Sequence, residues 1–188
     1  MGGLRTNVIG FDDAPFERAH RGDVPLVGVV CARTRVDGVL VSKVRRDGAN
    51  STSAMIAMIQ GSQFRAQVQA VLLQGIAVAG FNVVVLHALH EALGLTLIVV
   101  ARRSPDLASI RRAILGRVPG GARKWRLVEQ AGAMEPLRQV WVQRVGISLD
   151  HTREVLAATT LHGNLPEPLR MAHLIAGAMV TGRSRGRA

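Results

Sequence analysis

Two adjacent acids, Asp12 and Asp13, end an apolar run near the start of the chain and are the first residues whose type could do chemistry. The run reads VIGFDDAPF over residues 8–16. Ionised carboxylates at the edge of a buried strand cost free energy unless an arginine, a helix N-terminus or a metal ion faces them. Asp13 is expected to cap the turn at Pro15. For Asp12 a salt bridge to an arginine and a metal ion both remain open.

A second group with chemical potential lies near the other end of the chain, in PEPLRMAHLIAGAMV. Glu167, Arg170 and His173 are spaced by three, which places them on one face of a helix. We interpret Glu167 and Arg170 as candidates for contact with nucleic acid. The alternative is that Glu167 pairs with Arg170 and that His173 is a satisfied core histidine.

The stretch AGFN, with Gly80, Phe81 and Asn82, could bind a phosphate. A glycine turn with free amides before a helix can bind an anion if the helix N-terminus faces the cleft. Phe81 would offer a stacking face beside it. A plain tight turn with a buried Phe81 explains the same residues equally well.

The charge balance of the chain favours a polyanionic partner. The 188 residues contain 24 Lys and Arg against 13 Asp and Glu, a formal net charge of +11, and nearly all the cations are arginine. Arginine binds phosphate through a planar fork of donors and releases condensed counterions when it does so. Nucleic acid is therefore the expected partner. A coding bias that places arginine on an ordinary surface is the alternative, because net charge does not determine fold.

Strand and helix patterns alternate along the chain and must position these residues. Strands are expected over 7–13, 25–32, 38–45, 68–76, 95–102, 124–130 and 140–148. Helices are expected over 50–64, 82–93, 104–115, 151–160 and 166–180, with Ser148 or Asp150 as the cap of the fourth. A basic, mobile loop is expected over 116–121. The second and third strands are close enough in sequence to pair as a hairpin.

Three antiparallel strands followed by a helix and alternating strands and helices predict an α/β fold with a mixed sheet and flanking helices. The ribonuclease-H-like arrangement has this order of elements. The length suits one domain over residues 1–182, with a basic tail over 183–188.

One uncharged stretch, residues 66–90, is long enough for a membrane helix. It contains glutamines, an asparagine and two glycines, so a buried strand, a glycine turn and a helix explain it better. We therefore expect no membrane segment. No signal peptide is visible. The single Cys31 is compatible with a reducing compartment, and a cytoplasmic location is expected.

Three motifs together resemble the endonuclease V superfamily, and most closely its uncharacterised archaeal and bacterial branch. They are GFDDAPF at the start, GIAVAGFN in the middle and the Pro-Glu-Pro-x-Arg element that opens the last helix. The resemblance spans nearly the whole chain. It implies a ribonuclease-H-like fold in which the acid of the first strand binds Mg²⁺ or Mn²⁺ for phosphodiester hydrolysis.

The resemblance also assigns candidate roles to individual residues. Asp12 matches the first metal-binding and catalytic Asp of the nuclease, and His173 matches a late position that carries Asp or His near the metal. Asp47 is the only acid near the position of the nuclease's glutamate, and a turn residue before Gly48 is its alternative role. We expect Asp12, Asp47 and His173 to approach one another at the carboxyl end of the sheet.

The sequence departs from the nuclease after the central strand. Gln74 stands where endonuclease V carries an acid, and an amide supplies no negative charge to a metal. The leading hypothesis is therefore an endonuclease-V-like protein that binds nucleic acid and has a weakened, possible site for Mg²⁺ or Mn²⁺. The alternatives are a non-catalytic nucleic-acid-binding or regulatory protein of the same fold, and an enzyme that acts on a phosphorylated small molecule at the AGFN turn.

Overall fold

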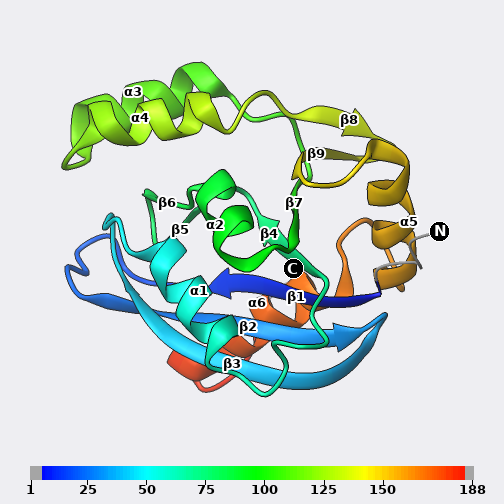
Figure 1. Ribbon diagram of the computed structural model, residues 1–188. Coiled ribbons are helices and arrows are strands. Elements are labelled where there is room, and N and C mark those ends of the chain that lie inside the picture. The colour runs from blue at the N-terminus through cyan, green and yellow to red at the C-terminus, as the bar shows by residue number, and fades with distance from the viewer. Residues whose placement is uncertain (1–5, 185–188) are drawn as a thin grey trace.

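A seven-stranded mixed sheet forms the centre of the computed structural model, which describes residues 6–184 (Figure 1). Its strand order is β3-β2-β1-β4-β7-β9-β8. The strands are β1 (Asn7–Asp13), β2 (Asp23–Ala32), β3 (Arg35–Arg45), β4 (Ala70–Gln74), β7 (Thr96–Ala101), β8 (Glu135–Leu137) and β9 (Val140–Val145). β1, β4 and β7 run parallel, and the other neighbours are antiparallel. The predicted mixed α/β sheet, including the β2–β3 hairpin, is confirmed.

Helices cover both faces of this sheet. They are α1 (Ser51–Gln60), α2 (Leu86–Leu93), α3 (Leu107–Arg117), α4 (Gly121–Gln130), α5 (Leu149–Thr159) and α6 (Glu167–Thr181). In the view of Figure 1, α1 and α2 lie in front of the sheet and α6 lies behind it, against β1 and β2. The central strands β4 and β7 are buried along almost their whole length, because helices pack on both of their faces.

The strand predicted over 124–130 is wrong, because these residues belong to α4. Gly121 and Lys124 are the buried residues of this helix, and Trp125 and Val128 are half-buried, so the buried face repeats every three or four residues. The predicted loop over 116–121 is correspondingly short. Gly120 has a φ of +69°, which lets the chain turn directly from α3 into α4.

Several element ends also differ from the prediction. The central strand stops at Gln74, and the helix expected from residue 82 begins at Leu86. The intervening chain forms a two-stranded ribbon of β5 (Ala77–Val78) and β6 (Asn82–Val83). The side-chain oxygen of Ser148 accepts a hydrogen bond from the His151 N–H, so Ser148 is the cap of α5.

No helix within residues 6–184 combines the length and the apolar character that a bilayer span requires. The predicted boundary between the domain and its basic tail stays a prediction, and residues 185–188 of that tail lie outside the described residues.

Candidate active site at the carboxyl end of the first strand

Asp12 and His173 form a direct pair at the carboxyl end of β1. The Nδ1 atom of His173, on α6, lies 2.8 Å from Oδ2 of Asp12. The other oxygen of Asp12 accepts a hydrogen bond from the backbone N–H of Asp13 at 3.0 Å. The side chains of Asp12 and His173 remain 16% and 40% exposed. The predicted approach of these two residues is therefore confirmed, although they are 161 positions apart in the chain.

A glycine brings α6 close enough to β1 for this pair to form. A Cβ atom added at Gly10 would lie 2.6 Å from the carbonyl carbon of Pro168 and 2.8 Å from the nitrogen of Leu169. Such distances are far below van der Waals contact, so only glycine fits here. Gly10 and Asp12 share one face of β1, because side chains alternate along a strand. The same face therefore supports the first turn of α6 and presents Asp12 to His173.

The two adjacent acids have unusual proton affinities. Burial raises the pKa of the Asp12 carboxyl, and the hydrogen bond and the charge of His173 oppose this rise. Burial and the neighbouring Asp12 charge raise the pKa of Asp13 to about 6. The backbone N–H of Ala79 partly offsets that rise. Asp13 thus faces the 79–81 loop, and the predicted cap of the Pro15 turn is not what the structure shows.

Gln74 lies next to Asp12 in the sheet. Phe11 on β1 is registered with Leu73 on the parallel strand β4, so Asp12 and Gln74 follow side by side. Gln74 is exposed at the end of its strand. The residue beside Asp12 is therefore a neutral amide at the carboxyl end of the sheet.

Asp47 does not join Asp12 and His173. Its Oδ1 accepts a hydrogen bond from the Phe81 N–H at 2.8 Å, and its Oδ2 lies 3.2 Å from Nε of Arg46. Its own N–H donates to the carbonyl of Ala79. Its carboxylate holds the 79–81 loop, and within residues 6–184 no three acids or histidines are close enough to share one ion, so Asp47 is not a third ligand beside Asp12 and His173. Its φ of +50° agrees with the alternative role of a turn residue.

The predicted phosphate-binding turn is used mainly for structure. Asn82 is fully buried, and its amide bonds the Ser51 N–H, the Arg45 carbonyl and the Asn50 side chain. It is therefore not presented to a ligand. Gly80 is exposed and Phe81 is half-buried, so these two remain available at the edge of the site. Because α2 begins at Leu86, the turn does not lead into a helix N-terminus as an anion site requires.

Glu167 and Arg170 bind each other. The Nε and Nη2 atoms of Arg170 lie 2.6–3.1 Å from the two carboxylate oxygens of Glu167. Glu167 is buried, whereas the Arg170 side chain is 40% exposed. The geometry agrees with the alternative of an intrahelical pair, and it leaves Glu167 without access to nucleic acid.

Two cations that the sequence analysis did not single out organise the surroundings of Asp47. Arg46 donates to the backbone carbonyls of Arg18 and His20, and its guanidinium lies 5.3 Å from the Phe16 ring. Lys124 is buried and donates its ammonium to the backbone carbonyl of Asp47. The helical period of α4 is the sequence signal that could have identified Lys124 as inward-facing.

The donors at the strand end limit which metal centre they could form. Within residues 6–184, no three His, Cys, Asp or Glu side chains are gathered closely enough to hold one ion. Magnesium commonly takes only one or two protein carboxylates and completes its shell with water and phosphate oxygens. Asp12, with the Asp13 charge beside it, fits one ion held in this way. The residues do not fit a centre of two ions, which needs several bridging anions.

An apolar pocket of about 370 Å³ opens beside the end of β4. Gly75 and Phe81 form part of one wall, and Leu107, Ile110 and Ile114 of α3 form part of another. A volume of this size accommodates a small planar molecule or a single base. Gly75 directly follows Gln74, so the pocket begins one residue beyond the end of β4. Its lining residues Val99 and Ala101 alternate with Val100, which is paired with Gln74, so the pocket lies on the opposite face of the sheet from Asp12.

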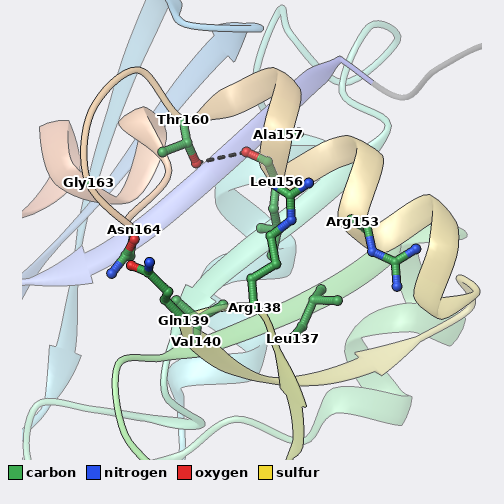
Figure 2. Close-up of a pocket in the computed structure, with 10 residues that line it drawn as sticks. All are labelled: Leu137, Arg138, Gln139, Val140, Arg153, Leu156, Ala157, Thr160, Gly163 and Asn164. Carbon is green, nitrogen blue, oxygen red and sulfur yellow. Dashed lines mark hydrogen bonds between the residues drawn. The ribbon is translucent and has the colours of Figure 1, made fainter.

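A smaller cavity of about 200 Å³ lies between the β8–β9 turn and α5 (Figure 2). Figure 2 shows the Arg138 side chain extending along α5 and the side chains of Gln139 and Asn164 side by side. Thr160 uses its hydroxyl to bond the Leu156 carbonyl at 2.7 Å. None of the residues predicted for the active site lines this cavity.

The fold and sequence are similar to those of several known proteins. A UPF0215 protein of Deinococcus radiodurans is 52% identical over 181 residues, covering 96% of this chain and 92% of the relative. A protein of unknown function from Archaeoglobus fulgidus superimposes with a TM-score of 0.87 at 29% identity, covering 94% of this chain and 99% of that one.

Endonuclease V structures share the fold at lower identity. The catalytic domain of human endonuclease V gives a TM-score of 0.61 at 17% identity, with coverage of 96% and 84%. Endonuclease V of Ciona intestinalis, in complex with a 24mer DNA containing an inosine followed by a ribo-adenosine, gives 0.57 at 15%, with coverage of 89% and 82%. These likenesses confirm the predicted endonuclease-V-like fold.

Family membership rests on the sequence itself. The family described as Endonuclease dU matches residues 5–180, which is nearly the whole chain. The predicted resemblance to an uncharacterised archaeal and bacterial branch agrees with the UPF0215 relatives. The chain belongs to the Endonuclease dU family.

Proposed function

We propose that this protein is a nuclease that binds nucleic acid at the carboxyl end of β1 and hydrolyses a phosphodiester bond beside Asp12. The observation that carries the proposal is the 2.8 Å pair of Asp12 and His173 at a strand end, in which the Asp12 side chain is 16% exposed and the His173 side chain 40% exposed. A carboxyl group with a direct histidine partner and a pKa raised by burial, such as Asp12, is typical of catalytic sites. The net charge of +11 supports a polyanionic substrate.

His173 has the orientation that such a reaction needs. An ionised Asp12 accepts the proton of Nδ1, which fixes the tautomer and leaves the lone pair of Nε2 for a ligand or for a proton. Asp12 would hold Mg²⁺ or Mn²⁺, and His173 would orient the Asp12 carboxylate through Nδ1, because its Nε2 lies on the far side of the ring and is directed away from Asp12. An ion bound there would offset the charge of the phosphate and lower the pKa of a bound water molecule.

The substrate class is suggested by the relatives and by the apolar pocket. The family is described as Endonuclease dU, and the Ciona endonuclease V complex contains inosine in its DNA. Enzymes that act at one abnormal base commonly move that base out of the stack into a pocket. We infer that the pocket beside Gly75 and Phe81 receives a deaminated base, the uracil of deoxyuridine or the hypoxanthine of deoxyinosine, while the phosphodiester lies at Asp12.

The test is a cleavage assay on matched duplexes that contain deoxyuridine, deoxyinosine or no modified base. We expect cleavage of a modified duplex with Mg²⁺ or Mn²⁺ and none with chelator. Asp12→Ala should reduce the rate at least a hundredfold, since it removes the only acid proposed to touch the ion. Asp37→Asn is the matched control, because Asp37 is an acid on β3 that pairs with Arg35. Equal loss in both variants would contradict the proposed site.

Gln74 provides a gain-of-function test of the same site. Gln74→Asp would place a carboxylate beside Asp12, so we expect tighter Mn²⁺ binding and faster cleavage, both abolished by adding Asp12→Ala. Calorimetric metal titration measures the first effect and single-turnover cleavage the second. If the natural chain cleaves efficiently and Gln74→Asp changes neither quantity, the reaction takes place elsewhere.

The incomplete donor set favours one alternative function. Without a third acid near Asp12, the protein could retain the nucleic-acid surface and lack hydrolysis. Binding of the modified duplex by the natural chain, with no cleavage under any metal, would support this second function. A phosphorylated small molecule at the 80–82 turn finds no support in the geometry, because Asn82 is buried and fully bonded.

A further inference from the structure

More than half of the excess positive charge lies on one structural unit. Residues 102–130, which we call the basic hairpin, comprise α3, α4 and their flanks. They contain eight Lys and Arg and two acids, a net charge of +6 out of the +11 of the whole chain. Figure 1 shows α3 and α4 side by side as a layer outside the sheet.

These charges are not neutralised within the protein. Asp106 caps α3 by accepting from the N–H and the hydroxyl of Ser109, and Glu129 accepts from the Trp125 indole at 2.6 Å. Both acids of the hairpin are therefore occupied by neutral donors. Across residues 6–184, no salt bridge involves any of the hairpin arginines, and all of them are exposed: Arg102, Arg103, Arg111, Arg112, Arg117, Arg123 and Arg126.

The inner side of the hairpin faces the proposed site. Ile110, Ile114 and Val128 line the apolar pocket at the end of β4. Lys124 is the one buried cation of the hairpin, and its contact with the Asp47 carbonyl joins α4 to the loop beside the strand end. The hairpin therefore has an apolar side toward the pocket and a cationic side toward solvent.

We propose that the basic hairpin binds the sugar–phosphate backbone of nucleic acid that flanks the cleaved bond. This inference rests on the proposed function and names the surface that holds the substrate beyond the reacting bond. Unpaired, exposed arginines clustered on one unit fit phosphates, because each contact releases condensed counterions. α3 is about 16 Å long, so it can span about five base pairs of one strand.

The experiment removes equal charge from two places. The triple variant Arg112→Gln, Arg117→Gln and Arg123→Gln neutralises the hairpin. The matched control, Arg33→Gln, Lys43→Gln and Arg183→Gln, neutralises exposed cations outside it. The binding affinity is measured as a function of salt concentration for two DNA molecules, a duplex of about 24 base pairs and a loop-closed duplex of about 8 base pairs. Both carry the same modified base at one end.

For the long duplex, we expect the hairpin variant to bind at least tenfold more weakly. The slope of log affinity against log salt concentration should become two to three units less steep, because each lost phosphate contact contributes about 0.9. The control and the short duplex should change little. Replacing the same three arginines with lysine should restore most of the slope, which separates lost charge from altered folding.

The outcomes distinguish the two proposals. If the natural chain binds and cleaves, and the hairpin variant matches the control on the long duplex, only the hairpin inference is overturned. If the natural chain binds neither duplex at low salt, both proposals fail. If the hairpin variant keeps DNA affinity but loses binding to vesicles of anionic lipid, the hairpin is a membrane-binding surface and the inference is again overturned.

Discussion

At the carboxyl end of β1, Asp12 is partly buried against α6 and Asp13 against the 79–81 loop, whereas on the basic hairpin seven arginines extend into solvent. Burial raises the pKa values of both acids, and the charge of Asp12 raises that of Asp13 further. The arginines are exposed, and none of them forms a salt bridge within residues 6–184. The first arrangement costs folding free energy and suits a fixed reaction site, while the second costs little and suits reversible contact with a long polyanion.

The comparison predicts that substitutions at the strand end change the free energy of unfolding strongly and that similar substitutions on the hairpin change it little. Gly10→Ala should have the largest effect, a loss of about 3 kcal/mol, since the new methyl group would overlap the backbone of Pro168 and Leu169. Denaturant unfolding measures this loss. An unchanged unfolding midpoint would show that α6 can move away from β1 at little cost.

The next effect concerns Asp13 and depends on pH. Its folded pKa of about 6 is above the unfolded value of 3.8, so well below pH 3.8 the carboxyl is neutral in both states and adds no cost. As pH rises through 6, the folded protein must bury a charge and loses stability. Asp13→Asn should therefore stabilise the protein by about 2 kcal/mol at pH 8 and hardly at pH 4.

Unfolding in chelator at both pH values tests this prediction. The exposed acid Asp150, at the start of α5, provides the control variant Asp150→Asn. An equal effect of Asp13→Asn at pH 4 and pH 8 would mean that the Asp13 carboxyl is not destabilised by burial.

Lys124 tests how firmly the basic hairpin is attached. Lys124→Met keeps the buried stem but leaves the Asp47 carbonyl without this donor, so we expect a loss of about 1 kcal/mol. Trypsin should then cut faster after Arg117 and Arg123. Arg126→Met, at an exposed position of the same helix, should leave the cleavage rate unchanged. Equal protection in both variants would show that Lys124 does not anchor the hairpin.

The smallest effect should come from Gly116→Ala, in the last turn of α3. A Cβ atom there would contact nothing within 4 Å, so the change should stabilise the protein by about 0.5–1 kcal/mol through helix propensity alone. Set against Gly10→Ala, it is the same chemical change with the opposite sign. If Gly116→Ala destabilised the protein, α3 would be closely packed at this position, and the contrast between the strand end and the hairpin would be contradicted.

The sheet and the Asp12–His173 pair were predictable from the sequence. Continuous apolar runs such as 70–73 and 97–101 indicate buried strands in an α/β protein, and the apolar run 8–11 ends directly before Asp12, which placed this acid at the end of a strand. The histidine was found through the Pro-Glu-Pro-x-Arg motif and the spacing by three in α6. The approach of Asp12 and His173, which are 161 positions apart, was implied by the family resemblance and not by a local pattern.

The role of Asp47 and the identity of α4 could not be read in the same way. Asp47 follows an edge strand, as a metal ligand could, but its carboxylate is taken by the Phe81 N–H, which is remote in sequence. In α4, polar residues and a buried lysine weaken the apolar signal of the inner face. The contact of Asp47 is tertiary and no local pattern encodes it, whereas the helical period of α4 is present in the sequence but carries few apolar side chains.

The contact of α6 with β1 has a consequence for how the protein is made. β1 leaves the ribosome before the rest of the sheet, and α6 leaves after it, so a nascent chain displays the groove at Gly10 uncovered throughout synthesis of the sheet. Asp12 also lacks its histidine during that time. The proposed nuclease would therefore stay inactive during translation and become active only when the helix that completes its core is in place.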